Sequence, residues 1–274
     1  MKVLKFIQAA VLLMFGCAVV SSSVAAKKLK EIDTLGIRVL SYNIHHANPP
    51  SRPDYIDLKA IAQVISAQRP DIVALQEVDV NTIRSGKSLH QADELGRMTG
   101  MKAYFAKSID YGGGEYGIAI LSKYPMKEMK SHRLPTAQST GGELRILVTA
   151  VIELPGGKEI LFANTHLDAQ PNDTNRILQA EKIVDILQQE KLPVILAGDF
   201  NAVASTRVIN KFDEHFTRSC IHNCEFTIPV IEPNKTIDYI AWAPKIKFKA
   251  SHHQVIPETY ASDHRPVLAV LQLQ

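Results

Sequence analysis

Acidic, amide and imidazole side chains in this sequence gather at the ends of apolar runs. The last example is Ser262-Asp263-His264, which stands just before the apolar run of residues 267–271. A strand that begins there would hold an acid and an imidazole with little freedom, as a catalytic pair requires. The same stretch is also typical of a turn with a surface histidine, so alone it decides nothing.

Other apolar runs end in polar groups in the same way. These ends are Asn43, Gln76-Glu77, Asn164-Thr165-His166 and Gly198-Asp199-Phe200-Asn201, and Asp238 is a further acid at a strand. Buried strands rarely end in carboxylates unless the charge has a partner, so this repetition indicates a shared cation. Oxygen and imidazole donors without usable thiolates favour Mg²⁺ or Mn²⁺ over structural zinc. Taken singly, each acid could equally be a helix cap or a turn residue.

The elements that must position these groups alternate between strands and helices. Apolar patterning predicts strands at residues 38–44, 72–75, 160–165 and 194–197, and helices at 57–68, 88–99 and 172–190. Two stretches share one order of strand, polar end, loop, helix, proline, strand and carboxylate, ending at Glu77 and at Asp199. This order predicts an internal duplication that places both acids beside one cleft. A single pair of similar units also arises by chance, because strand-helix-strand units are common.

The remaining elements are read from shorter patterns. Strands are predicted at residues 102–105, 116–122, 236–241, 246–255 and 266–271, with a hairpin formed by residues 144–152 and 158–165. Gly112-Gly113-Gly114 lacks the Lys-Ser/Thr and the helix of a nucleotide loop, so a hairpin or a loop at the rim of the site is the better interpretation. No low-complexity linker interrupts the chain, which favours one domain over residues 27–274.

The first 26 residues have the pattern of a signal peptide. Lys2 and Lys5 precede an apolar run over residues 6–20, and Val24-Ala25-Ala26 suits cleavage. The run is short for a full membrane span, and no later segment is long and apolar enough to cross a bilayer. We therefore expect cleavage after Ala26 and export to the periplasm or the medium. A lipoprotein anchored at Cys17 is the less favoured alternative.

Composition limits the partners of the exported part. Removing residues 1–26 leaves 29 basic and 28 acidic side chains, so the chain has no general attraction to polyanions. Nucleic acid is therefore a possible but not a favoured substrate, and we expect a monomer. The two remaining cysteines are Cys220 and Cys224, with His222 between them. In an oxidising setting a local disulfide fits them better than a metal site, and two free thiols remain open.

Seven motifs together resemble the endonuclease/exonuclease/phosphatase superfamily of metal-dependent phosphoesterases. They are Tyr42-Asn43-Ile44, the stretches 70–78 and 116–122, Asn164-Thr165-His166-Leu167-Asp168, Gly198-Asp199-Phe200-Asn201, Ile237-Asp238-Tyr239-Ile240 and Ser262-Asp263-His264-Arg265-Pro266. They occur in the order of the family and cover residues 37–272. The resemblance implies an α/β fold in which two mixed β-sheets pack face to face with helices on the outer faces. This four-layer sandwich would carry the active site at one end.

The resemblance also implies which residues hold the metal and the substrate. Glu77 would be the principal ligand of Mg²⁺ or Mn²⁺, and Asp263 a second ligand. Asn43 would lie close to the metal or the phosphate. Arg145 falls where the family often places a residue that faces the phosphate, although a solvent-facing strand arginine is nearly as good an interpretation.

The catalytic roles follow from the same resemblance. Asp199 would orient and deprotonate the attacking water, and Asn201 would hold that water or a phosphate oxygen. His166 and His264 would bind non-bridging oxygens, and Asp238 would orient His264 and favour its cationic form. Such a set fits phosphoester hydrolysis, because negative phosphoryl oxygens must be neutralised while a carboxylate removes the proton of the water.

The sequence departs from the family after Asn43. Nuclease members often carry an acid two residues after the first asparagine, where this chain has His45, followed by His46. This departure leaves open a different preference for a second metal or an imidazole that faces the substrate. The leading hypothesis is an exported phosphoesterase that acts on a nucleic acid, a sphingomyelin-like headgroup or a sugar or inositol phosphate. The alternative is a non-catalytic binding protein that uses the same cleft.

Overall fold

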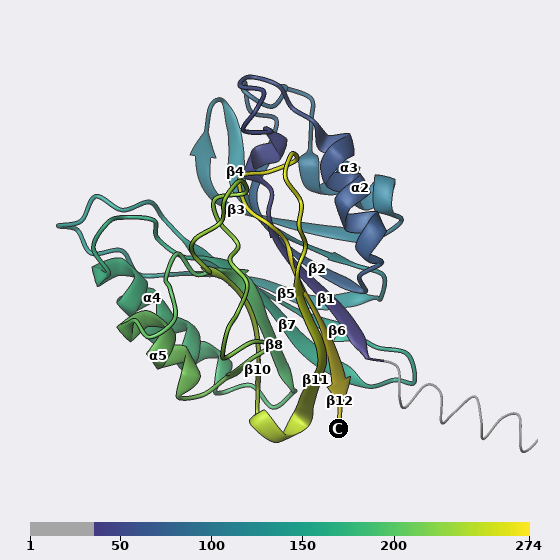
Figure 1. Ribbon diagram of the computed structural model, residues 1–274, viewed down its shortest axis with the longest axis vertical. Coiled ribbons are helices and arrows are strands. Elements are labelled where there is room, and N and C mark those ends of the chain that lie inside the picture. Colours follow the sequence, from purple (N-terminus) through teal and green to yellow (C-terminus); the bar gives the residue numbers. More distant parts are fainter. Residues whose placement is uncertain (1–35) are drawn as a thin grey trace, which may run out of the picture. The chain divides into compact units, whose positions relative to one another are not determined.

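Two six-stranded mixed β-sheets make up most of residues 36–274, which are the residues described by this computed structural model (Figure 1). In spatial order the first sheet contains β11 (Phe248–Val255), β12 (Val267–Leu273), β1 (Ile37–Asn43), β2 (Ile72–Val80), β4 (Gly114–Ser122) and β3 (Lys102–Tyr111). The second contains β5 (Met126–Arg133), β6 (Ile146–Glu153), β7 (Glu159–His166), β8 (Val194–Asp199), β10 (Asp238–Ala243) and β9 (Thr217–Arg218). The predicted signal peptide and the Cys17 alternative lie outside the described residues.

Helices cover the outer face of each sheet. They are α2 (Leu58–Gln68), α3 (Gln91–Thr99), α4 (Thr174–Leu187) and α5 (Arg207–Asp213), with short 3₁₀ turns η1 (His45–Ala47) and η2 (Lys245–Lys247). One apolar core joins the two sheets, a second lies under α2 and α3, and a third lies under α4 and α5. The predicted four-layer sandwich is therefore confirmed. Within residues 36–274, every helix is too short or too polar to span a membrane.

The period-two alternation of the strands decides which side chains face the space between the sheets. In β8, Ile195 and Ala197 belong to the core between the sheets, and Leu196 belongs to the core under α4 and α5. Asp199 continues the first series and so falls on the inner face at the end of the strand. The other inner-facing strands follow the same rule, which brings their polar ends to one place.

The predicted internal repeat corresponds to two units of the same topology. In each sheet a parallel pair, β1–β2 or β7–β8, is connected through a helix, α2 or α4. Each pair is flanked by antiparallel strands, β12 and β4 in one sheet and β6 and β10 in the other. The last strand of the second unit ends at Asp199, whereas β2 continues through Glu77 to Val80 and is longer than the predicted strand of residues 72–75, because its pairing with β4 resumes after an irregularity.

Two strands and one α-helix of the described residues were not anticipated from the sequence, namely β5, β9 and α5. Strand β5 lies at the edge of its sheet and is mostly exposed, so it lacks the apolar alternation that reveals inner strands. The triple-glycine stretch forms the turn between β3 and β4, with positive φ at Gly112 and Gly113, as a hairpin requires. Cys220 and Cys224 form the expected local disulfide.

Candidate active site

Six strand ends meet at the end of the sandwich opposite the C-terminus (Figure 1). The ends of β1, β2, β7 and β8 lie there together with the starts of β10 and β12, which run in the opposite direction. In the register of the second sheet, Asp199 stands directly opposite Asp238 on one side and His166 on the other. Strand pairing itself therefore assembles two acids and an imidazole from distant parts of the sequence.

Asp199 is a buried carboxylate at the centre of this arrangement. Its Oδ1 accepts a hydrogen bond of 2.9 Å from the backbone N–H of Asn201, and its Oδ2 accepts one of 3.1 Å from Asn43 Nδ2. Burial and the facing charge of Asp238 raise the pKa of Asp199 to about 7, although His264 and these hydrogen bonds oppose the shift. A carboxyl group with such a pKa can exchange a proton near neutral pH.

His264 forms a buried pair with Asp238. Its Nδ1 lies 2.9 Å from Asp238 Oδ2, and its Nε2 lies 3.7 Å from Asp199 Oδ2. Burial acts to lower the pKa of His264, but the charges of Asp238 and Asp199 and the hydrogen bond from Nδ1 outweigh it and raise the pKa to about 10. His264 is therefore a cation at neutral pH, with Nε2–H directed toward the site.

His166 lies on the other side of Asp199 and is in the opposite protonation state. Its Nδ1 lies 3.1 Å from an Arg145 guanidinium nitrogen, which can only donate, so Nδ1 accepts and the proton is on Nε2. Burial, the charge of Arg145 and then that of His264 lower the pKa of His166 well below its usual range. Its Nε2 lies 3.5 Å from Asp199 Oδ2. Arg145, itself paired with Glu143 at 3.0 Å, thus contacts the site through His166.

Asn201 and Asp263, two of the predicted site residues, make hydrogen bonds that fix the loops around the site. The Asn201 side chain donates to the backbone oxygen of Leu167 at 3.0 Å, so its amide links the loops after β7 and β8. Asp263 is half-buried, and its Oδ1 lies 3.3 Å from the hydroxyl of Ser262, which also donates to the backbone oxygen of Asn43. These bonds fix the segment before β12 against the end of β1.

Glu77 lies on the first sheet at an irregularity of the strand. The pairing of β2 with β4 shifts between Leu75 and Val78, and Glu77 has a left-handed backbone with φ of 57°. This bulge turns the side chain toward the site, where Glu77 Oε1 accepts a hydrogen bond of 3.1 Å from Asn43 Nδ2. The Asn43 amide thus bridges Glu77 and Asp199, the two acids of the repeated units.

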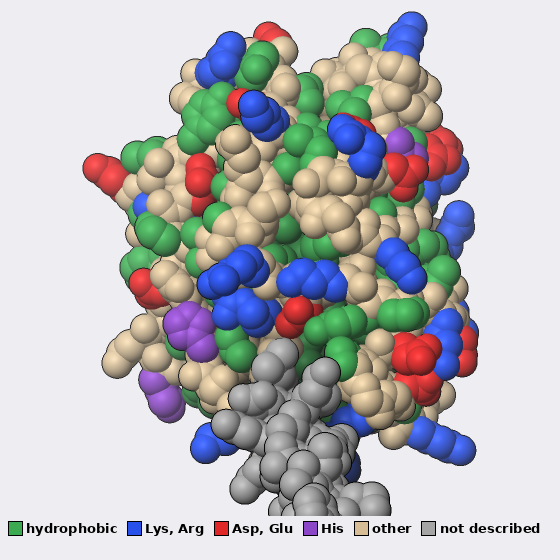
Figure 2. Space-filling model, turned by 90° about the vertical axis from the view of Figure 1, so that its right-hand side faces the viewer, with side chains coloured by type: hydrophobic (Ala, Val, Ile, Leu, Met, Phe, Trp, Pro, Cys, Tyr) green, Lys and Arg blue, Asp and Glu red, His purple; other side chains and the backbone are tan. Residues whose placement is uncertain are grey.

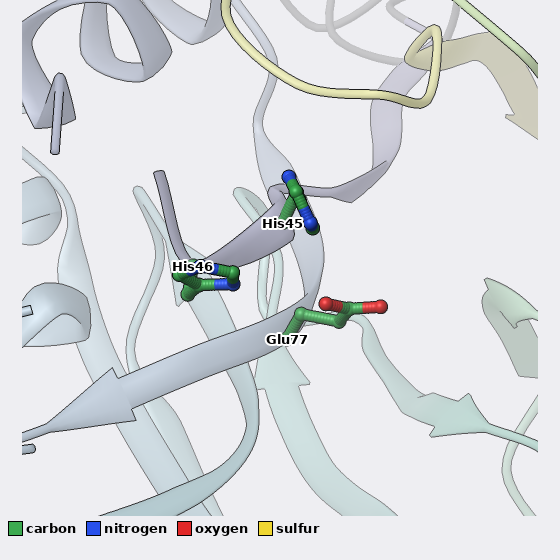
Figure 3. Close-up of side chains that lie close together, drawn as sticks. All are labelled: His45, His46 and Glu77. Atoms are coloured by element: carbon green, nitrogen blue, oxygen red, sulfur yellow. The ribbon is translucent and has the colours of Figure 1, made fainter. Parts of the chain in front are cut away.

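Two groups of side chains have the chemistry and spacing of metal ligands. His45, His46 and Glu77 have ligand atoms within 4.8 Å of one another (Figure 3), and so do Asp199, Asp238 and His264. The second group holds a proton better than a metal, because a cationic imidazole has no free lone pair. Glu77 is half-buried, and burial together with the charges of Arg84 and His45 lowers the pKa of the neighbouring His46 to about 4, so the His46 imidazole has a lone pair to offer. The donors around Glu77 therefore fit a divalent cation.

Two parts of the site were given no role of their own by the sequence, although Gln76 and Asn164 were among the polar strand ends named there. Gln76 Nε2 donates to Asn164 Oδ1 at 2.8 Å, and Asn164 Nδ2 donates to the backbone oxygens of Leu75 and Ala119, so one amide pair connects the sheets behind the site. The signal for this pair was the polar residue at an inner-facing strand position. Tyr116 on β4 is buried near Glu77 and Arg145, and its pKa is raised by burial.

Comparisons with known proteins agree with this geometry. The sequence profile of the Endonuclease/Exonuclease/phosphatase family matches residues 40–264. An inositol phosphosphingolipids phospholipase C of Schizosaccharomyces pombe is 28% identical over 181 residues, which are 60% of this chain and 41% of that relative. The chain thus spans about two fifths of the length of this curated relative.

Solved structures share the fold at low sequence identity. A family protein from Bacteroides thetaiotaomicron has a TM-score of 0.71 at 22% identity, with 87% of this chain and 98% of that chain covered. A mannosyl-6-phosphatase of the same species has a TM-score of 0.69 at 23% identity, with 86% and 99% covered. The human Nocturnin catalytic domain with bound sulfate has a TM-score of 0.69 at 22% identity, with 88% and 94% covered. The chain therefore belongs to the endonuclease/exonuclease/phosphatase family, whose members are divalent-metal-dependent phosphoester hydrolases.

Proposed function

We propose that this protein is an exported, metal-dependent phosphoesterase in which Asp199 deprotonates the attacking water. The observation that carries the proposal is the placement of the Asp199 carboxylate between the Nε2 atoms of His166 and His264, at 3.5 and 3.7 Å. These distances exceed a normal hydrogen bond and leave the carboxylate able to accept a proton from water. Export is supported by the leader pattern of residues 1–26.

The surrounding groups have separate tasks in this proposal. His264 offers a cationic Nε2–H and His166 a neutral one to the non-bridging oxygens of a phosphoester, and Arg145 holds the tautomer of His166. Asp238 keeps His264 charged and oriented. Mg²⁺ or Mn²⁺ held by Glu77, with Asp263 and Asn43 as the further proposed ligands, would supply Lewis-acid stabilisation of charge on the phosphoryl group.

The Asn43 amide couples these two functions. In the structure its Nδ2 donates to both Glu77 and Asp199, so it fixes the distance between the metal-binding acid and the base. Asn201 has the same effect from the other side, because its backbone N–H orients Asp199 Oδ1. The Asp199 carboxylate is thus held by hydrogen bonds from Asn201 and Asn43, while its Oδ2 faces the imidazoles. This fixed orientation favours one direction of attack by the water.

Exposed apolar side chains near the site favour a lipid phosphodiester as the substrate. Ile83 is 66% exposed on the loop after β2, Leu144 is 43% exposed beside Arg145, and Val203 is 40% exposed two residues after Asn201. Apolar side chains on loops that follow site residues suit an amphipathic substrate. The similarity to an enzyme named as a phosphosphingolipid phospholipase C supports the same class.

Nucleic acid is a weaker candidate because of the charge pattern. The chain after residue 26 is nearly neutral, and on the face displayed in Figure 2 the basic side chains lie interspersed with acidic ones. Proteins that track a nucleic-acid backbone use an extended basic surface. A sugar phosphate stays open, in line with the name of one structural neighbour.

The test measures release of p-nitrophenol from bis-p-nitrophenyl phosphate and p-nitrophenyl phosphate, with added Mg²⁺ or Mn²⁺ and with chelator. We expect metal-dependent release, faster from the diester, and then hydrolysis of sphingomyelin or inositol phospholipid vesicles ahead of plasmid DNA and sugar phosphates. The Asp185→Asn variant on α4 serves as the control for Asp199→Asn, because Asp185 is an exposed acid. Wild-type protein without metal-dependent release from any of these substrates would support a non-catalytic binding protein instead.

A further inference from the structure

His45 and His46 occupy the position where the sequence departs from the family, and the structure directs both toward Glu77. In Figure 3 one nitrogen of each imidazole lies on the side of the Glu77 carboxylate. One ligand atom from each of the three residues lies within 4.8 Å of the other two. Two ligand atoms bound to one zinc ion lie up to ~4 Å apart, because each metal–ligand bond is ~2.0–2.1 Å long. Small side-chain rotations are therefore enough to bring the three ligand atoms of this group from 4.8 Å to that separation.

The hydrogen bond of His45 prepares its ring for metal binding. His45 Nδ1 lies 2.8 Å from the backbone oxygen of Asn48, which can only accept. Nδ1 therefore carries a hydrogen, and in the neutral ring Nε2 keeps the lone pair. A carbonyl that fixes the tautomer of an imidazole from outside is the usual arrangement at metal-ligating histidines.

His46 contributes a ring with an unsatisfied nitrogen. Its Nδ1 is buried without a hydrogen-bond partner, and such atoms are rare in folded proteins. The backbone oxygen of His46 accepts a hydrogen bond of 2.7 Å from Gln91 Nε2, so α3 holds the residue in place. The two imidazoles stand edge to face with centroids 4.6 Å apart. These two contacts hold His46 beside His45.

The backbone under these rings is strained. His45, His46 and Ala47 all have positive φ, at 45, 43 and 61°, and Glu77 across from them has φ of 57°. Left-handed conformations in residues other than glycine cost about 1–3 kcal/mol each and persist where the surroundings enforce them. The buried Ala47 and the bond from Asp57 N to the Ala47 backbone oxygen at 2.7 Å supply that support. The strain thus serves to aim two consecutive imidazoles at one carboxylate.

We propose that His45, His46 and Glu77 form a second metal site that binds a divalent transition ion such as Zn²⁺. Two imidazoles and one carboxylate suit borderline metals better than Mg²⁺, which prefers an all-oxygen shell. Glu77 has two carboxylate oxygens, and Oε1 already accepts from Asn43. If the proposed function holds, Glu77 is shared between this ion and the Mg²⁺ or Mn²⁺ that activates the phosphoester. The site itself rests on the three side chains alone.

The test uses the metal-stripped full chain and Co²⁺ as a spectroscopic substitute for Zn²⁺. We expect a visible d–d absorption band on adding Co²⁺, its loss on adding Zn²⁺, and a Zn²⁺ affinity at least about tenfold weaker in His45→Asn and in His46→Asn. Asparagine is the chosen replacement because it tolerates the left-handed backbone of both positions. Circular dichroism confirms that each variant is folded.

Two controls separate this proposal from the proposed function. His252→Asn removes an exposed imidazole on β11 and should leave the Co²⁺ band unchanged. Asp199→Asn removes the proposed base and should keep the band although its activity is lost. A wild-type protein that shows the band but hydrolyses no phosphoester would support the site and not the reaction. A wild-type protein without the band, or folded His45→Asn and His46→Asn proteins that both retain it, would overturn the proposal.

Discussion

The two strand-helix-strand units end in acids with opposite surroundings. Asp199 ends β8 in regular register, buried and directly opposite Asp238. Glu77 sits on a bulge of β2, half-buried and beside two imidazoles. The same topology therefore provides one carboxylate that holds a proton near neutral pH and one that is suited to a cation. The difference arises from the bulge, which moves Glu77 out of the pairing that Asp199 retains.

The histidines around Asp199 also differ from those around Glu77. Around Asp199, His264 is charged through Asp238 and His166 is neutral through Arg145, so both present an N–H toward the carboxylate. In the first unit the neutral form of His45 presents the lone pair of Nε2, because its Nδ1–H is used by the Asn48 carbonyl. Donor hydrogens surround the proton-handling acid, and lone pairs surround the cation-binding acid. In His264, His166 and His45, the hydrogen bond made by Nδ1 decides whether Nε2 presents a hydrogen or a lone pair in the form described.

The largest expected effect is a difference in kinetics between the Asp199→Asn and Glu77→Gln variants. Asp199→Asn should lower kcat by about 10³ at every metal concentration, because amide nitrogen and oxygen cannot take the proton of water. Glu77→Gln should instead raise the Mg²⁺ concentration needed for half-maximal activity by about 10- to 100-fold, with much of kcat recovered at high metal. Steady-state kinetics over a metal series measures both. Recovery of Asp199→Asn by added metal would contradict the division.

Much of the fold could be predicted because its apolar patterning is regular. The inner strands and the helices α2, α3 and α4 show clear periodicity, whereas β5 is an exposed edge strand whose residues Met126–Arg133 carry no such pattern. The polar strand ends were also visible, since Asn43, Asp199 and Asp238 interrupt alternating apolar series. Local sequence rules reach this far because they depend on neighbours along the chain.

The rest depends on contacts between distant segments. Nothing near His166 in the sequence indicates that Arg145 would fix its tautomer, or that Asp238 would face Asp199 across a strand pair. The left-handed turn at His45 and His46 depends equally on tertiary support. The family resemblance could therefore predict the set of polar groups and the cationic form of His264, but not that Arg145 would hold His166 in its neutral form.

A smaller effect is expected in the pH dependence of activity, which tests the roles of Asp199 and His264 alone. Activity requires Asp199 deprotonated and His264 protonated, so kcat/KM should rise with pH through about 7 and fall near 10. A bound cation would move the acid limb lower.

Asp238→Asn removes the charge that raises both pKa values, so both limbs should shift to lower pH while kcat at the optimum falls by roughly 10². A variant that lowers kcat with unshifted limbs would refute the role of Asp238.

The smallest effect concerns the amide pair that joins the two units behind the site. Asn164→Ala removes the donor to the Leu75 and Ala119 carbonyls and the acceptor for Gln76, all in a buried region. Unsatisfied buried groups cost about 1–3 kcal/mol, so the free energy of unfolding from urea denaturation should fall by that amount. Asn234→Ala, at an exposed position, is the control and should change it by less than about 0.5 kcal/mol.

The kinetic consequence of Asn164→Ala decides whether this pair also sets the relation between the two acids. Asn164 lies two residues before His166 on β7, and Gln76 directly precedes Glu77 on β2. If the pair only stabilises the packing of the sheets, the folded variant keeps its kcat and its metal requirement. If it also holds Glu77 at its distance from Asp199, the metal requirement rises while the pH limbs stay fixed, because Asp238 and His264 still contact Asp199 from the second sheet and the segment before β12. We expect the second outcome with a change below about tenfold, since Asn43 independently bridges the two carboxylates.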